Sequence, residues 1–405
     1  MKLFRLSLLT TASLGTLFLS SLTHAAAFQL YELGAPVVGT AGVGQAVADD
    51  ASISYYNPAG MGSLSASQGM LGSQIILPHT DFSANSSNTI SGNNGGNAGL
   101  LAPGLGGYFV YNFSPKLKFG VSLTQPFGGA LDYNNHWVGR FNVQQMTFYT
   151  LNLNPSVAYQ VNRWMSLGAG VSVEYANLNE SVALPITPLI NGQLTVKAAN
   201  YAPGFNLGVL FTPAEATKVG VAFRSQIVHN LSGNVDFLNI TATPSVSTRM
   251  TMPANVIASV SQNVTNQISL LGELGWANWS TMRDTIIHVA GLTASTPQNW
   301  NDTYRVGVGG QYKLKSPIML QAGVSYDSSP TSKSKRLPEL PMDRQIRIAL
   351  GLEYFVSKAV TLGLSYEYIN FGNASINNPS SNGVLAGSYP TNYANVLQAS
   401  LNVKG

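Results

Sequence analysis

The sequence predicts an all-β protein, a 14-stranded antiparallel transmembrane β-barrel with an N-terminal hatch inside the lumen. Three observations carry this prediction: scarce charge, a period of two in the apolar residues, and connections that are alternately short and long. Only 9% of the 405 residues are Asp, Glu, Lys or Arg, against about 25% in ordinary soluble proteins. The mean hydropathy is only +0.10, which argues against a helical membrane protein. A membrane barrel divides its side chains between lipid and lumen, and it fits both values.

Apolar residues alternate with small or polar residues through most of the expected strands. In residues 165–175, Leu167 and Val171 are apolar, whereas Ser166 and Ser172 are polar. Successive strand side chains point to opposite faces, so each segment has one apolar face. A soluble sandwich alternates too, but its outer face usually carries charge. Here the polar face is mostly Gly, Ser, Thr, Asn and Gln, so we place the apolar face against lipid and the polar face in the lumen.

The connections between the expected strands alternate in length. Tight turns such as Ser114-Pro115 and Ser357-Lys358 alternate with longer connections such as 79–104 and 127–143. Outer-membrane barrels have short periplasmic turns and longer external loops, and an even strand number places both termini in the periplasm. We expect strands at 66–78, 105–113, 117–126, 144–161, 165–180, 199–212, 217–236, 246–264, 267–283, 302–315, 317–329, 341–356, 359–376 and 392–404.

Residues 1–25 read as a secretory signal peptide. Lys2 and Arg5 precede an apolar stretch, and cleavage is expected after Ala25 or Ala27. The alternative is an uncleaved anchor helix, which the short core interrupted by Ser, Thr and Gly disfavours. Removal of the two signal-peptide cations leaves 19 basic against 17 acidic residues. The mature chain therefore gives no case for binding nucleic acid.

Residues 26–65 form a second predicted unit, ahead of the barrel at 66–405. This unit is rich in Gly and Ala and holds Asp49-Asp50 and Asn57-Pro58-Ala59-Gly60. It is either a free tail in the periplasm or a hatch inside the lumen. Small residues permit close backbone packing in a narrow barrel, whereas a free tail is typically more charged and less apolar. The composition favours the hatch.

No catalytic or metal-binding arrangement is apparent in the sequence. The chain has no Cys, which excludes disulfides, thiol catalysis and thiolate metal sites. No G-x-S-x-G nucleophile motif is present. The His residues beyond the signal peptide lack metal-ligand spacing; they are His79, His136, His229 and His288. We therefore expect no enzyme activity, no metal site and no cofactor.

Nine short motifs follow one another between Ala26 and Arg344. They are AAFQL (26–30), GQAVADDA (44–51) with YNPAGM (56–61), LNPSVAY (153–159) with WMSLG (164–168), WANWS (276–280), WNDTYR (300–305), AGVSYD (322–327) and PMDR (341–344). In this order they resemble the outer-membrane transporters of long-chain fatty acids and aromatic hydrocarbons, the FadL/TodX type. The resemblance implies a barrel in which a hydrophobic substrate is captured from outside, passes to an internal pocket, and leaves through the wall into outer-membrane lipid. We expect a monomer.

The resemblance also assigns residues. The N-terminus that reaches the pocket in this family corresponds to Phe28 and Leu30. The hatch contact corresponds to Asn57, Pro58 and Ala59, preceded by Asp49 and Asp50.

An inward kink in the third strand forms the side exit of this family. In this chain, Pro126 with Gly128-Gly129 is placed to interrupt that strand, because Pro lacks a backbone donor.

Charged residues of the lumen bear on the substrate. In fatty-acid-handling members of the family, basic residues inside the barrel meet the carboxylate, and a missing cation favours a neutral hydrocarbon. The candidates for lumen charges are Arg224, Arg305, Asp343 and Arg344. We interpret each as a structurally satisfied charge, since buried charges are usually paired. Fatty acids are the first expected substrate, and aromatic or alkane hydrocarbons are the second.

Three rival functions are open at this point. A general diffusion porin predicts a lumen without a hatch and a constriction rich in both signs of charge. A surface adhesin predicts that the long loops are the working part. A barrel lipase needs a nucleophile and a base, which the sequence does not display.

Overall fold

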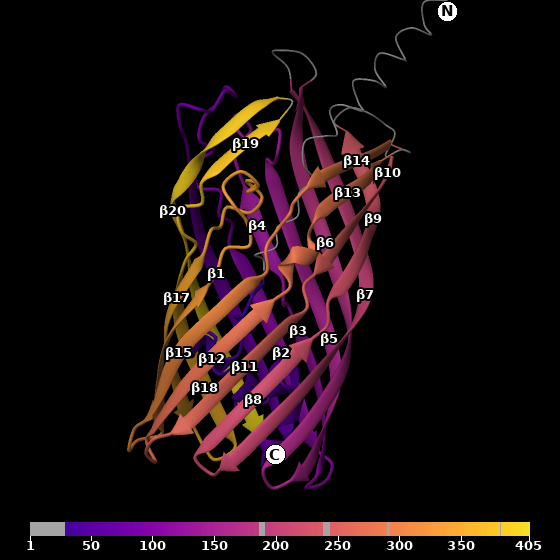
Figure 1. The fold of residues 1–405 in the computed structure, drawn as a ribbon. Coiled ribbons are helices and arrows are strands. Elements are labelled where there is room, and N and C mark those ends of the chain that lie inside the picture. The colour runs from indigo at the N-terminus through magenta and orange to yellow at the C-terminus, as the bar shows by residue number, and fades with distance from the viewer. Residues whose placement is uncertain (1–28, 186–190, 238–243, 290–291, 381) are drawn as a thin grey trace, which may run out of the picture.

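The computed structural model describes residues 29–185, 191–237, 244–289, 292–380 and 382–405. They form a closed antiparallel barrel (Figure 1). The first strand, β1 (Gln68–Ala84), pairs with the last, β20 (Gly383–Lys404), and with β2 (Ala102–Asn112) on its other side. The predicted fold class is therefore confirmed. The expected signal peptide and Phe28 lie outside the described residues.

Fourteen antiparallel strands make up the wall. The other strands are β3 (Leu117–Thr124), β4 (Gly128–Asp132), β5 (Gln145–Asn162), β6 (Met165–Pro185), β7 (Asn191–Ala214), β8 (Thr217–Arg224), β9 (Ile227–Phe237), β10 (Ser245–Met252), β11 (Asn255–Asn263), β12 (Ile268–Ala277), β13 (Asp284–Val289), β14 (Leu292–Pro297), β15 (Thr303–Lys313), β16 (Ile318–Asp327), β17 (Gln345–Phe355), β18 (Val360–Asn370) and β19 (Ile376–Ser380). Six wall strands are interrupted and consist of two pieces each: β3–β4, β8–β9, β10–β11, β12–β13, β14–β15 and β18–β19.

The two ends of the barrel differ as the sequence predicts. At one end, short turns join the strands, and the C-terminus lies there; we call it the short-turn end (Figure 1). At the other end lie the longer connections, among them residues 85–101, 133–144 and 328–344. We call it the long-loop end.

The predicted strand ends are wrong at the long-loop end. Here β6 runs to Pro185 and β20 begins at Gly383, well beyond the expected limits of 180 and 392. The predicted loop 284–301 contains the hairpin β13–β14. These parts of the strands extend above the apolar band, so they lack the apolar face on which the sequence prediction depends.

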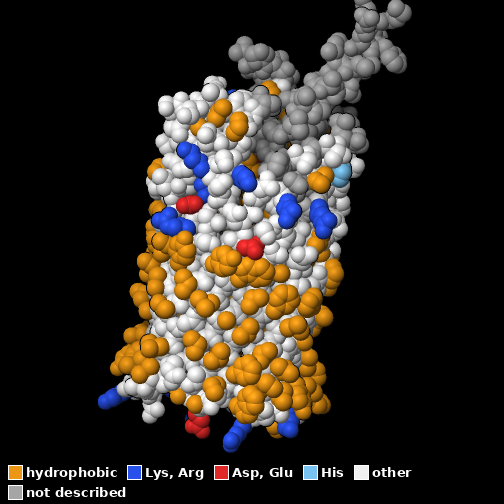
Figure 2. Space-filling model, in the orientation of Figure 1, with side chains coloured by type: hydrophobic (Ala, Val, Ile, Leu, Met, Phe, Trp, Pro, Cys, Tyr) orange, Lys and Arg blue, Asp and Glu red, His pale blue; other side chains and the backbone are white. Residues whose placement is uncertain are grey.

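The outer face of the barrel is apolar and the inner face is polar or small. On β6, Leu167 and Val171 are exposed, whereas Ser166 and Ser172 are buried. In Figure 2, apolar side chains cover the middle and lower part of the face shown, and Lys and Arg gather above this band and at the lower end. The alternation in the sequence therefore places the apolar side chains outside, as in barrels that face lipid.

Residues 29–67, here called the inserted segment, lie inside the barrel. Its short helices are η1 (Pro36–Thr40), η2 (Gln45–Val47), α2 (Ile53–Tyr56) and η3 (Pro58–Ser63), and most of their residues are buried. The segment packs against the inner face of the wall on several sides, including β5, β6, β7, β11, β17 and β18. Among the described residues, no helix is long and apolar enough to cross a membrane. A further helix, η4 (Trp279–Thr281), separates β12 from β13.

Glycines of the wall permit the close approach of the inserted segment. A Cβ at Gly72 of β1 would overlap the backbone carbonyl of Gly34, and a Cβ at Gly168 of β6 would overlap the backbone of Ala59. Only a residue without a side chain leaves room for backbone at these points. The Gly content of the chain is thus partly explained by contact between the wall and the inserted segment.

We predict that Gly72→Ala destabilises the protein by about 1–3 kcal/mol, because the added methyl must displace the backbone of the inserted segment. Gly69→Ala is the matched control on the same strand, since its Cβ would meet only Phe109, at 3.8 Å. Denaturant unfolding in detergent measures the stability, and chymotrypsin cleavage within the inserted segment reports its seating. Equal behaviour of the two variants would contradict this account of the packing.

Candidate functional site

We call residues 125–127, between β3 and β4, the break. Gln29, Leu30 and Tyr31, here called the leading end of the inserted segment, occupy it. The Leu30 N–H donates a hydrogen bond to the Pro126 carbonyl over 2.8 Å, and Gln29 forms an antiparallel bridge with Phe127. Proline has no N–H with which to continue a strand ladder. The interruption predicted from Pro126 is present, and it forms the contact point of the chain's leading end.

The wall beside this break is incompletely paired. The ladder between β2 and β3 ends at Gly107 and Leu123, and contact resumes at an isolated bridge between Gly99 and Leu131. Between these points, β2 pairs with β1 on its other side. A wall with ladder hydrogen bonds on only one side of a strand separates at a lower cost than a fully paired wall.

The leading end fills the space behind the break. Gln29, Leu30 and Tyr31 border a cavity of only about 30 Å³, together with Phe127 and Ile257. This volume has room for roughly one or two water molecules. A hydrophobic ligand can therefore occupy the space only when the leading end moves away.

Arg224 faces the same space from β8. Its guanidinium donates to the Tyr55 carbonyl over 2.7 Å and to Asn154 Oδ1 over 3.2 Å, and it lies 3.8 Å from the centre of the Tyr55 ring. The ion pairs of the described residues do not include Arg224. It is therefore a half-buried cation with neutral partners, placed beside the leading end.

A buried charge cluster fixes the next part of the inserted segment to the opposite wall. We define the charge cluster as Tyr31, Glu32, Glu273, Arg305, Asp327, Arg347 and Glu367. Arg347 Nε donates to Glu32 Oε1 over 3.0 Å, and both arginines donate to Asp327 Oδ2, Arg305 over 2.8 Å and Arg347 over 2.5 Å. Burial raises the pKa of the Tyr31 hydroxyl, which stays protonated and donates to Asp327 over 3.1 Å.

The charge cluster also holds the turn of backbone before η2. Arg305 donates to the Ala41 carbonyl over 2.6 Å, and Glu273 accepts the N–H groups of Gly44 and Gln45, each over 3.0 Å. Charge-assisted bonds to buried backbone are the stronger kind. Arg305, predicted as a lumen charge, is thus placed inside this cluster and not at the break.

The Asn-Pro-Ala motif seats the inserted segment on β6 and β7. Asn57 Nδ2 donates to the Ala46 carbonyl over 2.8 Å and to the Val209 carbonyl of β7 over 3.1 Å. Its Oδ1 accepts the Ala59 N–H over 3.2 Å and caps η3, whose first residue is Pro58. Asn57 thereby joins two parts of the inserted segment to the wall through one side chain.

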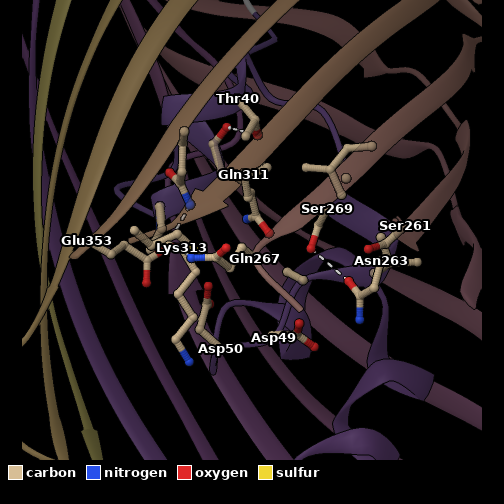
Figure 3. Close-up of a pocket in the computed structure, with 18 of the residues that line it drawn as sticks. Thr40, Asp49, Asp50, Ser261, Asn263, Gln267, Ser269, Gln311, Lys313 and Glu353 are labelled. Atoms are coloured by element: carbon tan, nitrogen blue, oxygen red, sulfur yellow. Dashed lines mark hydrogen bonds between the residues drawn. The ribbon is translucent and has the colours of Figure 1, made fainter. Parts of the chain in front are cut away.

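Asp49 and Asp50 border a separate polar chamber at the short-turn end. The chamber has a volume of about 720 Å³ and lies between the inserted segment and the turns, lined also by Lys313 and Glu353 (Figure 3). Asp49 is exposed and pairs with Lys218, and Asp50 Oδ1 accepts the Ser52 N–H over 2.8 Å. The polar lining suits water, so this large chamber is unlike the apolar seat of the leading end.

Asp343 and Arg344 lie away from the break, at the start of β17. Asp343 pairs with the buried Arg336 over 2.8 Å, and Arg344 lies 3.8 Å from the other Asp343 oxygen with its side chain partly exposed. Arg336 also donates to backbone carbonyls of Ser375 and Met342. The structure therefore places both predicted charges in the support of the connection 328–344.

An apolar cluster fills the lumen toward the long-loop end, and the sequence did not identify it. Phe127 of the break contacts Trp279, which contacts Trp300, each pair with ring centres 6.1 Å apart. Tyr133 stacks on Trp137 and donates to the Pro338 carbonyl. Phe127, Tyr133, Trp137 and Trp300 lie in segments that the sequence predicts as loops, whereas Trp279 lies in the expected strand 267–283. The Phe, Trp and Tyr residues in these segments were the sequence signal that could have indicated the apolar cluster.

The described residues hold no group of three or more His, Asp and Glu side chains placed to bind a metal ion.

A lipid-facing barrel with a filled lumen and one incompletely paired wall defines the class of membrane β-barrels that carry an internal segment. The chain belongs to the family described as outer membrane protein transport protein (OMPP1/FadL/TodX), whose profile matches residues 16–404.

Individual proteins resemble the chain over nearly their whole length. It is 23% identical over 398 residues to the long-chain fatty acid transport protein of Escherichia coli O6:H1, covering 87% of this chain and 88% of that protein. The crystal structure of a Pseudomonas aeruginosa FadL homologue superposes with a TM-score of 0.86 at 22% identity, covering 93% and 99%. The Ralstonia pickettii toluene transporter TbuX gives a TM-score of 0.70 at 18% identity, covering 93% and 100%. The structural likenesses support the barrel fold.

We predict that Arg347→Met lowers the stability of the seated inserted segment by about 3–5 kcal/mol, because it leaves the buried Glu32 carboxylate without its ion-pair partner and removes one of the two arginines that pair with Asp327. Arg344→Met, near the start of the same strand, should cost about 0–1 kcal/mol, because its ion pair is partly exposed. Chymotrypsin cleavage within the inserted segment and the denaturant midpoint measure the two effects. A stable, protected Arg347→Met protein would contradict the role of the charge cluster.

Proposed function

We propose that this protein carries hydrophobic small molecules through the outer membrane by passive passage, long-chain fatty acids first and hydrocarbons second. The observation that carries the proposal is the leading end of the inserted segment in the break of the wall, where Leu30 bonds to Pro126. Membership of a family of outer-membrane transport proteins supports it. So do the relatives described as carriers of long-chain fatty acids and toluene.

Capture of such a substrate requires no energy source. An apolar molecule gains about 25 cal/mol for each Å² of apolar surface removed from water, or about 0.8 kcal/mol per buried CH₂ group. The apolar cluster above the break, which includes Phe127, Trp279 and Trp300, offers such an environment. Movement of the loops that cover it would admit the substrate from the long-loop end.

Displacement of the leading end then supplies the pocket and the exit. The space now occupied by Gln29, Leu30 and Tyr31 adjoins both the apolar cluster, through Phe127, and the incompletely paired wall at β2 and β3. A substrate that replaces these residues lies next to the membrane. Release into lipid costs a hydrophobic molecule little free energy, since lipid tails are as apolar as the pocket.

We extend the proposal to the organisation of the chain. Residues 1–25 are a cleaved signal peptide, the inserted segment acts as the hatch, and the long-loop end faces outside, so that both mature termini are periplasmic. Asn57, Pro58 and Ala59 hold the hatch in place, and Asp49 and Asp50 form its periplasmic rim. The protein acts as a monomer without cofactor, metal or catalytic step.

Arg224 is the proposed contact for a carboxylate head group. It is a lumen cation beside the leading end that forms no ion pair among the described residues, and its present partners are neutral oxygen atoms and an aromatic ring. A carboxylate that accepts from this guanidinium would replace bonds to neutral oxygen atoms by bonds in which donor and acceptor are both charged. This position favours fatty acids over neutral hydrocarbons as the first substrate.

A diffusion porin and an adhesin fit the structure less well. In a porin the lumen would stay open. Here the inserted segment leaves a cavity of only about 30 Å³ behind the break. An adhesin gives no reason for a leading end seated in the wall. Deletion of residues 29–67 should abolish gated uptake but leave adhesion by the loops intact.

We predict that cells carrying the protein take up labelled oleate and toluene faster than cells without it. Arg224→Leu should weaken oleate uptake about 10–100-fold, which corresponds to the roughly 1.5–3 kcal/mol of a hydrogen bond to a charged group, and leave toluene uptake unchanged. Lys315→Leu, at a short turn, is the charge-matched control. Equal uptake with and without the protein would overturn transport, whereas equal loss for both substrates would overturn the role of Arg224 alone.

We predict that locking the leading end to the break stops uptake. Paired antiparallel residues lie about 4.5–5.5 Å apart between Cα atoms, within the reach of a disulfide. The double variant Gln29→Cys/Phe127→Cys uses the observed bridge in a chain without other cysteines. Oxidation should block uptake and reduction should restore it, with the two single variants unaffected by either treatment. Full uptake by the oxidised double variant would show that the leading end need not move.

A further inference from the structure

The charge cluster holds more buried carboxylates than cations. Four acidic side chains, Glu32, Glu273, Asp327 and Glu367, share the guanidinium groups of Arg305 and Arg347. All six residues are buried. An uncompensated charge in such a place costs several kcal/mol, and carboxyl groups usually avoid this cost by binding a proton.

Two of the four carboxylates are fully provided with donors. Glu273 accepts from Arg305 Nε, from the Ser259 hydroxyl and from the backbone of the inserted segment. Asp327 accepts from both arginines and from the Tyr31 hydroxyl. These two carboxylates balance the two guanidinium charges, so Glu32 and Glu367 are the surplus.

Of the four carboxyl groups of the charge cluster, Glu367 has the fewest hydrogen-bond donors around it. It is 0% exposed, and neither of its oxygens accepts a hydrogen bond from a donor of the described residues. Arg347 Nε lies 3.8 Å from Glu367 but only 3.0 Å from Glu32. The side chains of Glu32 and Glu367 therefore meet at the same nitrogen atom, one from the inserted segment and the other from β18.

Within the described part of the chain, no further titratable group around Glu367 is free to offset it. The strand β17 contributes Arg347, β16 contributes Asp327, β15 contributes Arg305 and β12 contributes Glu273, all already engaged. On its other side, β20 places Val396 opposite Glu367, followed by Gln398, which donates to the Gly34 carbonyl over 3.0 Å. Tyr31 donates to Asp327.

We propose that Glu367 holds a proton and donates it in a hydrogen bond to Glu32, and that loss of this proton releases the leading end of the hatch. Two adjacent ionised carboxylates in a buried site repel each other. Glu32 directly follows Tyr31 and lies two residues from Leu30, so repulsion acts on the part of the chain that fills the break. The inference rests on the proposed function only for its consequence, a faster uptake at higher pH.

The direction of the pH effect follows from linkage. The seated form holds the proton, whereas the released form exposes both carboxyl groups to water and gives the proton to solvent. The seated form is therefore favoured at low pH and loses stability as the pH rises and the proton leaves Glu367. For one proton, the ratio of seated to released protein should fall up to tenfold per pH unit in this range.

The test uses a small trifluoromethyl tag on Leu30→Cys, which is the only cysteine in the chain. Fluorine NMR of the full-length protein in detergent then gives the populations of seated and released leading ends between about pH 5 and pH 9. We expect the released population to grow with pH. Glu367→Gln and, independently, Glu32→Gln should stay seated throughout, because an amide keeps a hydrogen bond without a charge. Heat-modifiable mobility on gels confirms that each variant is folded.

Glu353→Gln is the matched control. Glu353 lies on the neighbouring strand β17, accepts from Gln321 over 2.8 Å and lines the polar chamber, so its removal should leave the pH dependence intact. Populations that do not change with pH, or an unchanged pH dependence in both Glu367→Gln and Glu32→Gln, would overturn the inference. Because the NMR measurement involves no substrate, its result is independent of the uptake assays that test the proposed function.

Discussion

The contact of Arg305 and Arg347 with the inserted segment is the interaction on which the rest of the structure depends. Through Glu32, Ala41 and the groups that Glu273 accepts, it fixes the inserted segment to the wall opposite the break. Without it, a Gly-rich stretch with short helices would have little reason to remain ordered in the lumen. The seat of Leu30 at Pro126 is positioned by this anchor, and the closure of the wall follows from that seat.

The position of the inserted segment also depends on wall residues that have no side chain. Glycines at 72, 168 and 208 leave room for backbone or for the Asn57 side chain. The barrel is thereby divided into an apolar half toward the long loops and a polar chamber toward the short turns. The inserted segment lies between the two, and the break in the wall is on the apolar side of it.

Local patterns in the sequence predicted local features. Alternation at Leu167 and Ser166 was sufficient to assign the two faces, and Pro126 located the interruption of the third strand, since both effects act within a few residues. The charge cluster could not be predicted from the sequence, because its members, from Tyr31 to Glu367, are far apart along the chain. They lie on the inserted segment and on β12, β15, β16, β17 and β18. The sequence identified Arg305 but not its partners. The hairpin β13–β14 was missed because strands above the membrane carry no apolar stripe.

We propose that this protein lets a hydrophobic molecule pass from water to the membrane without an energy source. Proteoliposomes that contain only the purified protein, without nucleotide or ion gradient, test this passage with labelled oleate added outside. We expect saturable transfer that is faster than in protein-free vesicles and is lost when the leading end is fixed at the break. Transfer at the protein-free rate, or transfer that needs an energy source, would contradict it.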